Sequence, residues 1–321
     1  MRNLGGFFMP VVYANTQEAT MPEQYQKPAL SFADQLELLK NRGLEVADEP
    51  HAISQLSSIS YYRLSAYWYP YRERDDQGIV GDNFIEGTSF DDVVNLYEFD
   101  RHLRLLVIDA LERVEVYVRT LISYHMAHTY GPFGHNDAVN FHPNFQHAKW
   151  LAKLSREADR SSDAFIAHYK NKYAGFPQLP IWMITEVMSL GSLSFCYKGL
   201  KHLDKKAISS QLGLHHKGLA DWLHKLTYIR NVCAHHSRLW NRELSLKPVR
   251  PRNADWNTPI TPRNDRIFYV LLMLRYLLKT TSNGSHWHQK CNTLLEPIAE
   301  NEQWRIAMGM PENWQGHPLW K

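Results

Sequence analysis

The stretch from Ser89 to Tyr130, SFDDVVNLYEFDRHLRLLVIDALERVEVYVRTLISYHMAHTY, decides the fold class of this 321-residue chain. It contains neither Gly nor Pro, and Gly131-Pro132 ends it sharply. At ~1.5 Å per residue, an unbroken helix of this length spans about 60 Å, which is typical of a bundle scaffold or a subunit interface. Apolar residues recur in it at helical spacing, namely Leu96, Leu103, Leu106, Val107, Ala110, Leu111, Val114, Val118 and Leu121.

Helical signals also dominate the sequence on both sides of this stretch. Upstream, Ser31 with Asp34 predicts a helix ending near Gly43, and a second helix follows Pro50. Downstream, helices are expected at about 146–159, 163–173, 181–198 with a break at Gly191 as an alternative, 203–212, 216–238, 264–280 and 286–298. Residues 75–87 and 248–262 are expected to be loops. No segment shows sustained strand alternation, so the predicted fold is all-α, with long antiparallel helices as in a bundle.

The predicted organisation has four parts. Residues 1–29 form a disordered N-terminal tail, 30–87 an N-terminal helical extension, 88–300 the main helical domain and 301–321 an irregular C-terminal tail. The extension holds an aromatic cluster whose rings either stack on bases or, more commonly, pack in a core or an interface. Its members are Tyr61, Tyr62, Tyr67, Trp68, Tyr69 and Tyr71.

Composition excludes several classes of protein. Hydrophobic residues make up 44% and charged residues 21%, which argues against disorder. Three widely spaced cysteines, Cys196, Cys233 and Cys291, support neither a disulfide framework nor a zinc site. No apolar run is long enough to span a bilayer, and the short patch near the start lacks a cleavage site, so the cytoplasm is the expected compartment.

Positive charge is concentrated in one window of the chain. The formal net charge is +3, but residues 201–250 hold ten Lys or Arg against three Asp or Glu, an excess of +7 that leaves −4 for the rest. Six histidines lie in the same window. Such a stretch is either the footprint of a polyanion site or a solvated basic face.

The helix predicted over 216–238 carries the residues best suited to chemistry. On a helical wheel, Arg230 falls within the apolar stripe formed by Leu219, Leu226 and their neighbours, where a guanidinium must be paired or open into a cleft. Asn231 and His235 are one turn apart and project together from the flank of that stripe. The three polar groups can therefore converge at the edge of a buried face. The alternative is a structural ion pair of Arg230, with Glu186 or Glu112 as the partner.

Other polar residues are candidates for supporting roles. Glu115 and Arg119 form either a surface ion pair or part of the same site, and Arg238, Arg242, Lys217 and Lys225 could bind an RNA backbone. The pairs His125/His128, His215/His216 and His286/His288 have the spacing of metal ligands, but no Cys or carboxylate completes a recognisable set. No metal and no cofactor is therefore expected.

The segment Arg230-Asn231-Val232-Cys233-Ala234-His235 fits the Arg-x4-His signature of HEPN ribonucleases. Over about residues 27–300 the chain resembles the abortive-infection (Abi) family of the AbiD/AbiF type. The resemblance implies a HEPN-like helical bundle and phage defence through RNA cleavage. It rests on the string from Ile229 to Arg242 and on LYEFDRHLR (96–104), LERVEVYVR (111–119) and LPIW (179–182) with Glu186 and Gly191.

These residue types suit metal-independent cleavage of RNA. His235 can act as base or acid near neutral pH, Arg230 can grip phosphate oxygens, and Asn231 can orient either partner. DNA lacks the attacking 2′-hydroxyl and is not an expected substrate. The chain is thus expected to be an endoribonuclease of an abortive-infection or toxin–antitoxin system. The alternatives are a non-catalytic module that binds RNA or senses phage, and a purely structural helical partner.

The expected partners follow from this hypothesis. A single Arg-x4-His motif supplies one proton-transfer group, so a homodimer with a shared site is predicted. An unrestrained ribonuclease would poison its own cell, so an inhibitor is expected, either a structured non-coding RNA or a protein. No membrane partner is expected.

Overall fold

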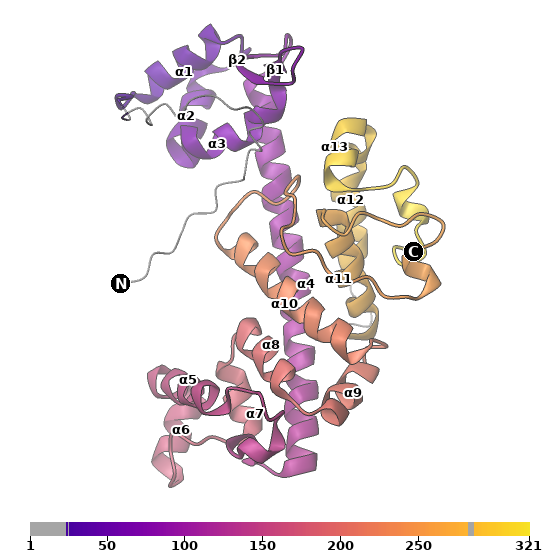
Figure 1. Cartoon of the computed structure of the whole chain (residues 1–321). Coiled ribbons are helices and arrows are strands. Elements are labelled where there is room, and N and C mark those ends of the chain that lie inside the picture. The colour runs from indigo at the N-terminus through magenta and orange to yellow at the C-terminus, as the bar shows by residue number, and fades with distance from the viewer. Residues whose placement is uncertain (1–23, 25, 282–285) are drawn as a thin grey trace.

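Helix α4 (Phe90–Tyr130) is the spine of the fold, as the sequence predicts. In this computed structural model, which describes residues 24, 26–281 and 286–321, α4 runs almost the full length of the molecule (Figure 1). Ser89 and Asp92 close a capping box at its start, and Gly131 ends it with a φ of 79° that glycine adopts without strain. The all-α prediction is confirmed, with thirteen α-helices among the described residues.

The N-terminal extension packs at one end of α4. It contains α1 (Phe32–Asn41), α2 (Glu49–Ile59) and α3 (Tyr61–Trp68), and Ser31 caps α1 as predicted. The prediction of a loop over 75–87 is wrong in part, because β1 (Arg72–Arg74) and β2 (Val80–Phe84) form an antiparallel hairpin there. Only Phe84 of β2 is buried, so the strand lacks the alternation that reveals a half-buried strand in sequence. Residues 1–23 and 25 of the predicted tail lie outside the described residues.

The aromatic cluster of the extension is divided between core and surface. Tyr67 and Trp68 are buried, and Trp68 meets Tyr61 edge-on with ring centroids 4.7 Å apart. Tyr62 is 86% exposed and Tyr69 48% exposed. Core packing therefore accounts for the buried rings, whereas base stacking by the exposed ones stays a prediction.

The opposite end of α4 carries α5 (His147–Arg160), α6 (Ala164–Lys172), α7 (Ile181–Ile184), α8 (Leu190–Gly199) and α9 (His202–Ser210). The helix predicted over 181–198 is broken, but at Met188-Ser189 rather than at Gly191. Ser189 caps α8 by accepting the Ser192 N–H, which starts a new helix there. Gly191 lies inside α8, where an added Cβ would be 3.3 Å from Thr227 of α10, so its small size permits close packing of the two helices.

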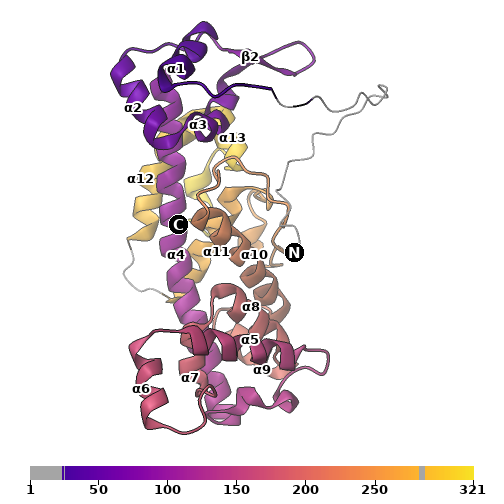
Figure 2. The same ribbon diagram turned by 90° about the vertical axis from the view of Figure 1, so that its left-hand side faces the viewer.

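The middle of α4 is covered by α10 (His216–Ala234), α11 (Ile267–Thr281) and α12 (Trp287–Glu300), as Figure 2 shows from the side. Helix α13 (Glu302–Met308) follows α12 nearer the N-terminal extension, where its Trp304 meets Tyr71 with ring centroids 5.6 Å apart. Every residue of α11 from Ile267 to Leu274 is buried. The prediction of an irregular tail over 301–321 is wrong. It holds α13, and Trp314 and Trp320 are buried because they pack against Phe268.

Short 3-10 helices complete the described structure. They are η1 (Tyr69–Tyr71), η2 (Gly134–Asn136), η3 (Ala138–Asn140), η4 (Thr185–Val187), η5 (Ala254–Trp256) and η6 (Trp314–Gly316).

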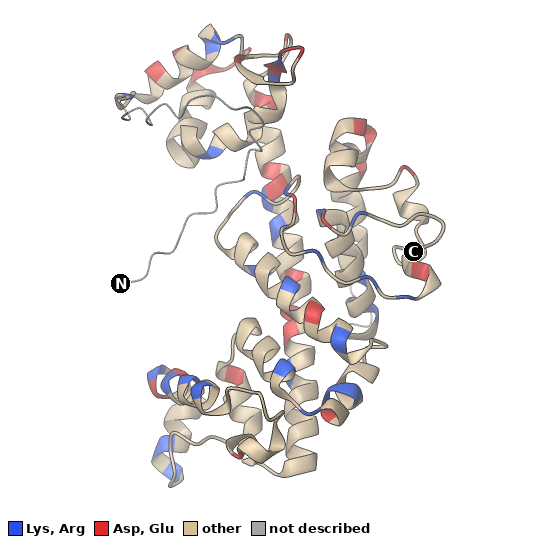
Figure 3. Ribbon diagram, viewed as in Figure 1, with Lys and Arg blue, Asp and Glu red and all other residues tan. Residues whose placement is uncertain are grey.

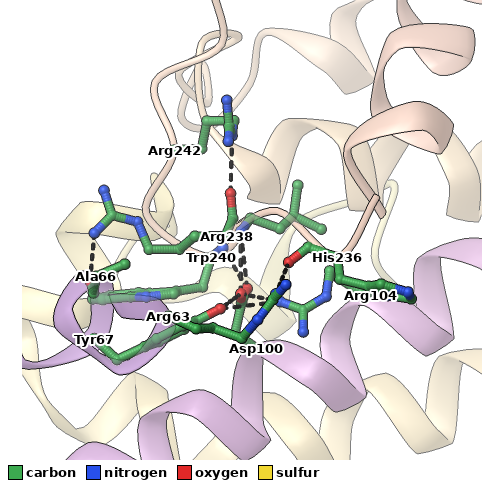
Figure 4. A network of polar contacts seen from close by, with 10 residues as sticks. Arg63, Ala66, Tyr67, Asp100, Arg104, His236, Arg238, Trp240 and Arg242 are labelled. Atoms are coloured by element: carbon green, nitrogen blue, oxygen red, sulfur yellow. Dashed lines mark hydrogen bonds and ion pairs between the residues drawn. The ribbon is translucent and has the colours of Figure 1, made fainter. Parts of the chain in front are cut away.

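One buried carboxylate joins three parts of this fold (Figure 4). Asp100 of α4 is fully buried and forms an ion pair with Arg104, which is 4% exposed. It accepts hydrogen bonds from the Tyr67 hydroxyl at 2.7 Å and from the backbone N–H groups of Leu239 and Trp240 at 3.1 and 2.7 Å. Burial raises the pKa of Asp100, and the charge of Arg104 and these hydrogen bonds oppose that rise. Asp100 therefore fixes both α3 and the segment after α10 onto α4.

Replacement of Asp100 by Asn should lower the free energy of unfolding by about 3–5 kcal/mol, because Arg104 would keep its buried charge without a counter-charge. Urea titration of the intact chain measures this. The matched control is Asp109→Asn, which removes an exposed i,i+4 partner of Arg113 and should cost less than about 1 kcal/mol. Equal losses for the two variants would show that the Asp100 network does not anchor the fold.

Candidate active site at the end of α10

Helix α10 ends at Ala234, four residues before the predicted end at 238. His235 is the C-cap residue, and His236 adopts the left-handed region with a φ of 55°. The N–H of Ser237 donates to the Val232 carbonyl and that of His236 to the Cys233 carbonyl, both at 3.0 Å, which is the closure of a Schellman motif. Glycine usually takes this left-handed position after a helix, so the histidine at 236 did not indicate in the sequence that the helix ends there.

The three predicted catalytic residues all lie on the surface at this helix end. Arg230, Asn231 and His235 are exposed, and an Nη of Arg230 donates to Oδ1 of Asn231 at 3.4 Å. The prediction that Arg230 lies on the apolar face is wrong, although Leu219, Leu226 and Ile229 are buried as expected. A helical wheel gives only the direction in which a side chain leaves the helix axis. Whether Arg230 is buried depends on whether a neighbouring element packs against α10 at that position.

A second group of predicted residues lies beside Arg230. Arg119 of α4 donates to Glu115 at 2.9 Å, to Glu186 at 3.2 Å and to the Met188 carbonyl at 3.1 Å. Burial raises the pKa of Glu115, and the positive charges of Arg119 and Arg230 act against this rise. The structure thus brings Arg230 into the electrostatic range of the Glu115–Arg119–Glu186 group. Neither Glu186 nor Glu112 forms an ion pair with Arg230 among the described residues.

His235 stands apart from this group. No hydrogen bond to its imidazole is present in the described part of the chain, and its backbone N–H donates to the Asn231 carbonyl at 3.0 Å. Arg230 and His235 are five positions apart, so their side chains diverge by about 140° around the helix axis. One copy of the chain therefore presents Arg230 and His235 to solvent in different directions.

The arginines that follow the motif are engaged in packing. Arg238 donates to the Ala66 carbonyl of α3, and burial lowers its pKa. Arg242 is half-buried, and its Nε donates to the Arg238 carbonyl at 2.9 Å. Figure 4 shows both side chains at the junction of α3 with the segment after α10. A role for either arginine in binding RNA stays a prediction.

The two lysines predicted to bind RNA lie farther along α10. Lys225 forms an ion pair with Asp221 at 3.5 Å, and Asp221 also accepts the Val249 N–H. Lys217 is exposed in the first turn, and no ion pair engages it within the described ranges. Lys217 is therefore the freer of the two to meet a ligand.

Sequence reasoning missed Arg63 and the role of Asp100. An Nη of Arg63 on α3 donates to the His236 carbonyl at 2.8 Å, directly after His235 (Figure 4). Nothing in the sequence links residues so far apart. Asp100 left a weak signal, because a carboxylate stands among the apolar positions of α4 with Arg104 one turn later.

The described residues contain no group of three or more His, Cys, Asp or Glu side chains that could hold a metal ion. Of the predicted histidine pairs, His125 instead binds Asp204 at 2.8 Å. No helix among the described residues has the length and apolar character needed to cross a membrane.

Comparison with known proteins gives one result. A family model described as Abi-like protein matches residues 54–241, more than half of the chain. The match begins within α2 and ends just after α10, so it includes Arg63, Asp100, the Glu115–Arg119–Glu186 group and the α10 motif. No curated protein and no solved structure gives a significant match.

Replacement of Arg63 by Ala should loosen the turn at His235-His236. A hydrogen bond from a charged donor contributes ~1.5 kcal/mol, so the His236 and Ser237 amides should exchange with solvent about tenfold faster. Hydrogen–deuterium exchange of a peptide covering 235–242 measures this. The matched control is Arg74→Ala in the exposed hairpin, which should leave that peptide unchanged. An unaltered exchange rate in the Arg63 variant would contradict the assignment.

Proposed function

Since the chain belongs to the Abi-like protein family, we propose that it is a metal-independent endoribonuclease of an abortive-infection defence or toxin–antitoxin system. The observation that carries the proposal is the exposure of Arg230, Asn231 and His235 at one helix end, with Arg230 in the electrostatic range of the Glu115–Arg119–Glu186 group. Surface exposure suits a macromolecular substrate, because a long RNA cannot enter a closed cavity.

The proposed reaction uses the 2′-hydroxyl of RNA as its nucleophile. The 2′-oxygen attacks the adjacent phosphorus while a base takes its proton, and the bond from phosphorus to the 5′-oxygen breaks as an acid protonates that oxygen. His235 is the proposed proton-transfer group. Arg230 binds the phosphate oxygens and stabilises their growing negative charge. Asn231, which accepts a hydrogen bond from Arg230, orients the guanidinium.

A second candidate function is a module that binds RNA, or senses phage, without cleaving. The favouring observation is that no described side chain orients the His235 imidazole, as a fixed catalytic base usually requires. RNA cleavage by the purified chain distinguishes the two functions directly.

Replacement of Arg230 or His235 by Ala should each abolish cleavage while the helical content stays unchanged. A general base or acid supplies ~100- to 10,000-fold, so the loss should fall in that range, and Asn231→Ala should be milder. Single-turnover cleavage of a labelled RNA measures the rates. Cleavage by wild type should persist in EDTA and should not extend to single-stranded DNA of the same sequence.

The control for this experiment is His236→Asn. The neighbouring imidazole is also exposed, asparagine tolerates the left-handed backbone, and the carbonyl that binds Arg63 is retained. This variant should stay near the wild-type rate. Near wild-type activity of His235→Ala, or full dependence on a divalent ion, would refute the proposed chemistry.

We also propose that two copies of the chain share one site. Transesterification without a metal works best with a proton-transfer group on each side of the phosphorus, and one copy supplies only His235. The divergence of the Arg230 and His235 side chains on α10 also supports a shared site. A two-fold axis beside the helix end would place His235 of one copy opposite Arg230 of the other. Val116 and Tyr124 of α4, which are 50% and 64% exposed, offer apolar surface on the same helix as Glu115.

The shared site predicts complementation. Arg230→Ala and His235→Ala proteins are inactive alone, but a mixed dimer keeps one intact His and one intact Arg, so partial cleavage should return on mixing. Sedimentation at micromolar concentration should give the mass of a dimer. A fully active monomer rules out the shared site and leaves Glu115 or water as the second group.

A further inference from the structure

Three histidines and two lysines gather where α9 meets the start of α10. The rings of His202 and His216 are 4.4 Å apart between centroids, and those of His215 and His216 are 4.1 Å apart. Lys205 and Lys217 lie close enough that their charges act on His216. We call these five residues the α9–α10 basic cluster. His202, His215 and Lys217 are exposed, whereas His216 is 9% exposed.

The cluster gathers two ammonium groups and three imidazoles, and no carboxylate pairs with them among the described residues. None of its five side chains forms an ion pair within residues 24, 26–281 and 286–321; Lys205 instead donates to the Lys198 carbonyl at 3.2 Å. Burial and the other members of the cluster lower the pKa of His216. The nearby carboxylate of Asp204 is engaged by His125 and Tyr130 at 2.8 and 2.9 Å. An anion bound here would supply the missing counter-charge and would find both imidazole N–H donors and ammonium groups.

Much of the remaining positive charge of the 201–250 window is already engaged. Lys225 pairs with Asp221 and Lys247 with Asp265, while Arg238 and Arg242 bind backbone carbonyls. Figure 3 shows basic residues on α9 and at intervals along α10, with acidic residues between them. The basic side chains of the window that form no ion pair in the described ranges therefore gather mainly around α9, where Lys201 and Lys206 lie near the α9–α10 basic cluster, while Arg230 lies at the other end of α10.

One face of α10 connects this cluster to the candidate active site. His224, Asn231 and His235 follow Lys217 by 7, 14 and 18 residues. At about 100° per residue, all four side chains point within about 40° of one another around the helix axis. All four are exposed. The distance from His215 to His235 along the helix is about 30 Å at ~1.5 Å per residue.

We propose that the α9–α10 basic cluster is a second phosphate-binding site, which anchors the backbone of an RNA whose distant part lies at His235. This inference rests on the proposed function in one respect, namely that RNA binds at His235. A run of about nine nucleotides covers 30 Å at ~3.4 Å per stacked nucleotide. Long RNA therefore contacts both ends of α10, and a trinucleotide contacts one.

The test measures how tightly RNAs of two lengths bind to the protein with and without the cluster. The variant is His202→Gln, His215→Gln and Lys217→Gln together, all exposed positions, in a His235→Ala background that prevents cleavage. Fluorescence anisotropy should show about tenfold weaker binding of a 20-nucleotide RNA, with binding of a trinucleotide unchanged. The slope of log affinity against log salt should flatten by about 0.7 or more, since at least one phosphate contact is lost. A DNA 20-mer should lose affinity in parallel, because phosphate is the group recognised.

The matched control is His51→Gln, His168→Gln and Lys149→Gln, which removes the same residue types from exposed positions on α2, α6 and α5. It should bind the 20-mer like the parent protein. Equal weakening of trinucleotide and 20-mer, or no weakening of either, overturns the proposal. A different outcome separates the two proposals. If binding of the 20-mer depends on the cluster but the wild-type chain does not cleave RNA, the proposed function is overturned and this inference is left intact.

Discussion

The buried carboxylate of Asp100 is the constraint on which the arrangement of the candidate site depends. A charge with no exposed surface is tolerated only when it is fully paired, and Asp100 achieves this with Arg104, the Tyr67 hydroxyl and two backbone N–H groups. Those two N–H groups belong to Leu239 and Trp240, directly after the α10 motif. The need to satisfy one buried charge therefore fixes where the chain goes after His235.

A consequence is that the N-terminal extension is part of the site's framework. Arg63 and the Ala66 carbonyl, both on α3, bind the segment after α10. The left-handed His236 lies between these contacts, and such a conformation in a non-glycine residue persists where the surroundings hold it. The exposed His235 is thus carried by a turn that two distant parts of the sequence, α3 and α4, hold in place.

Helix α10 links two environments of opposite character. Its C-terminal end places Arg230 next to a group containing two carboxylates, Glu115 and Glu186, that hold Arg119. Its N-terminal end gathers imidazoles and lysines that lack a carboxylate partner in the described structure. A rigid helix keeps the two ends about 30 Å apart, so an extended polyanion can meet both, whereas a small ligand meets one.

The sequence by itself determined the helical fold, the spine α4 and its ends, because helical periodicity and capping are local properties. It also singled out the Arg230–His235 segment, Glu115, Arg119 and Glu186, through their types and spacing. It gave the wrong end for α10, because a histidine takes the left-handed position usually held by glycine, and it missed the hairpin, because β2 buries only Phe84. Only the tertiary structure decided that Arg230 is exposed, that Arg63 binds beside His235 and that His202 meets His216. Those facts depend on which distant segments pack together, and long-range pairing leaves no periodic trace along the chain.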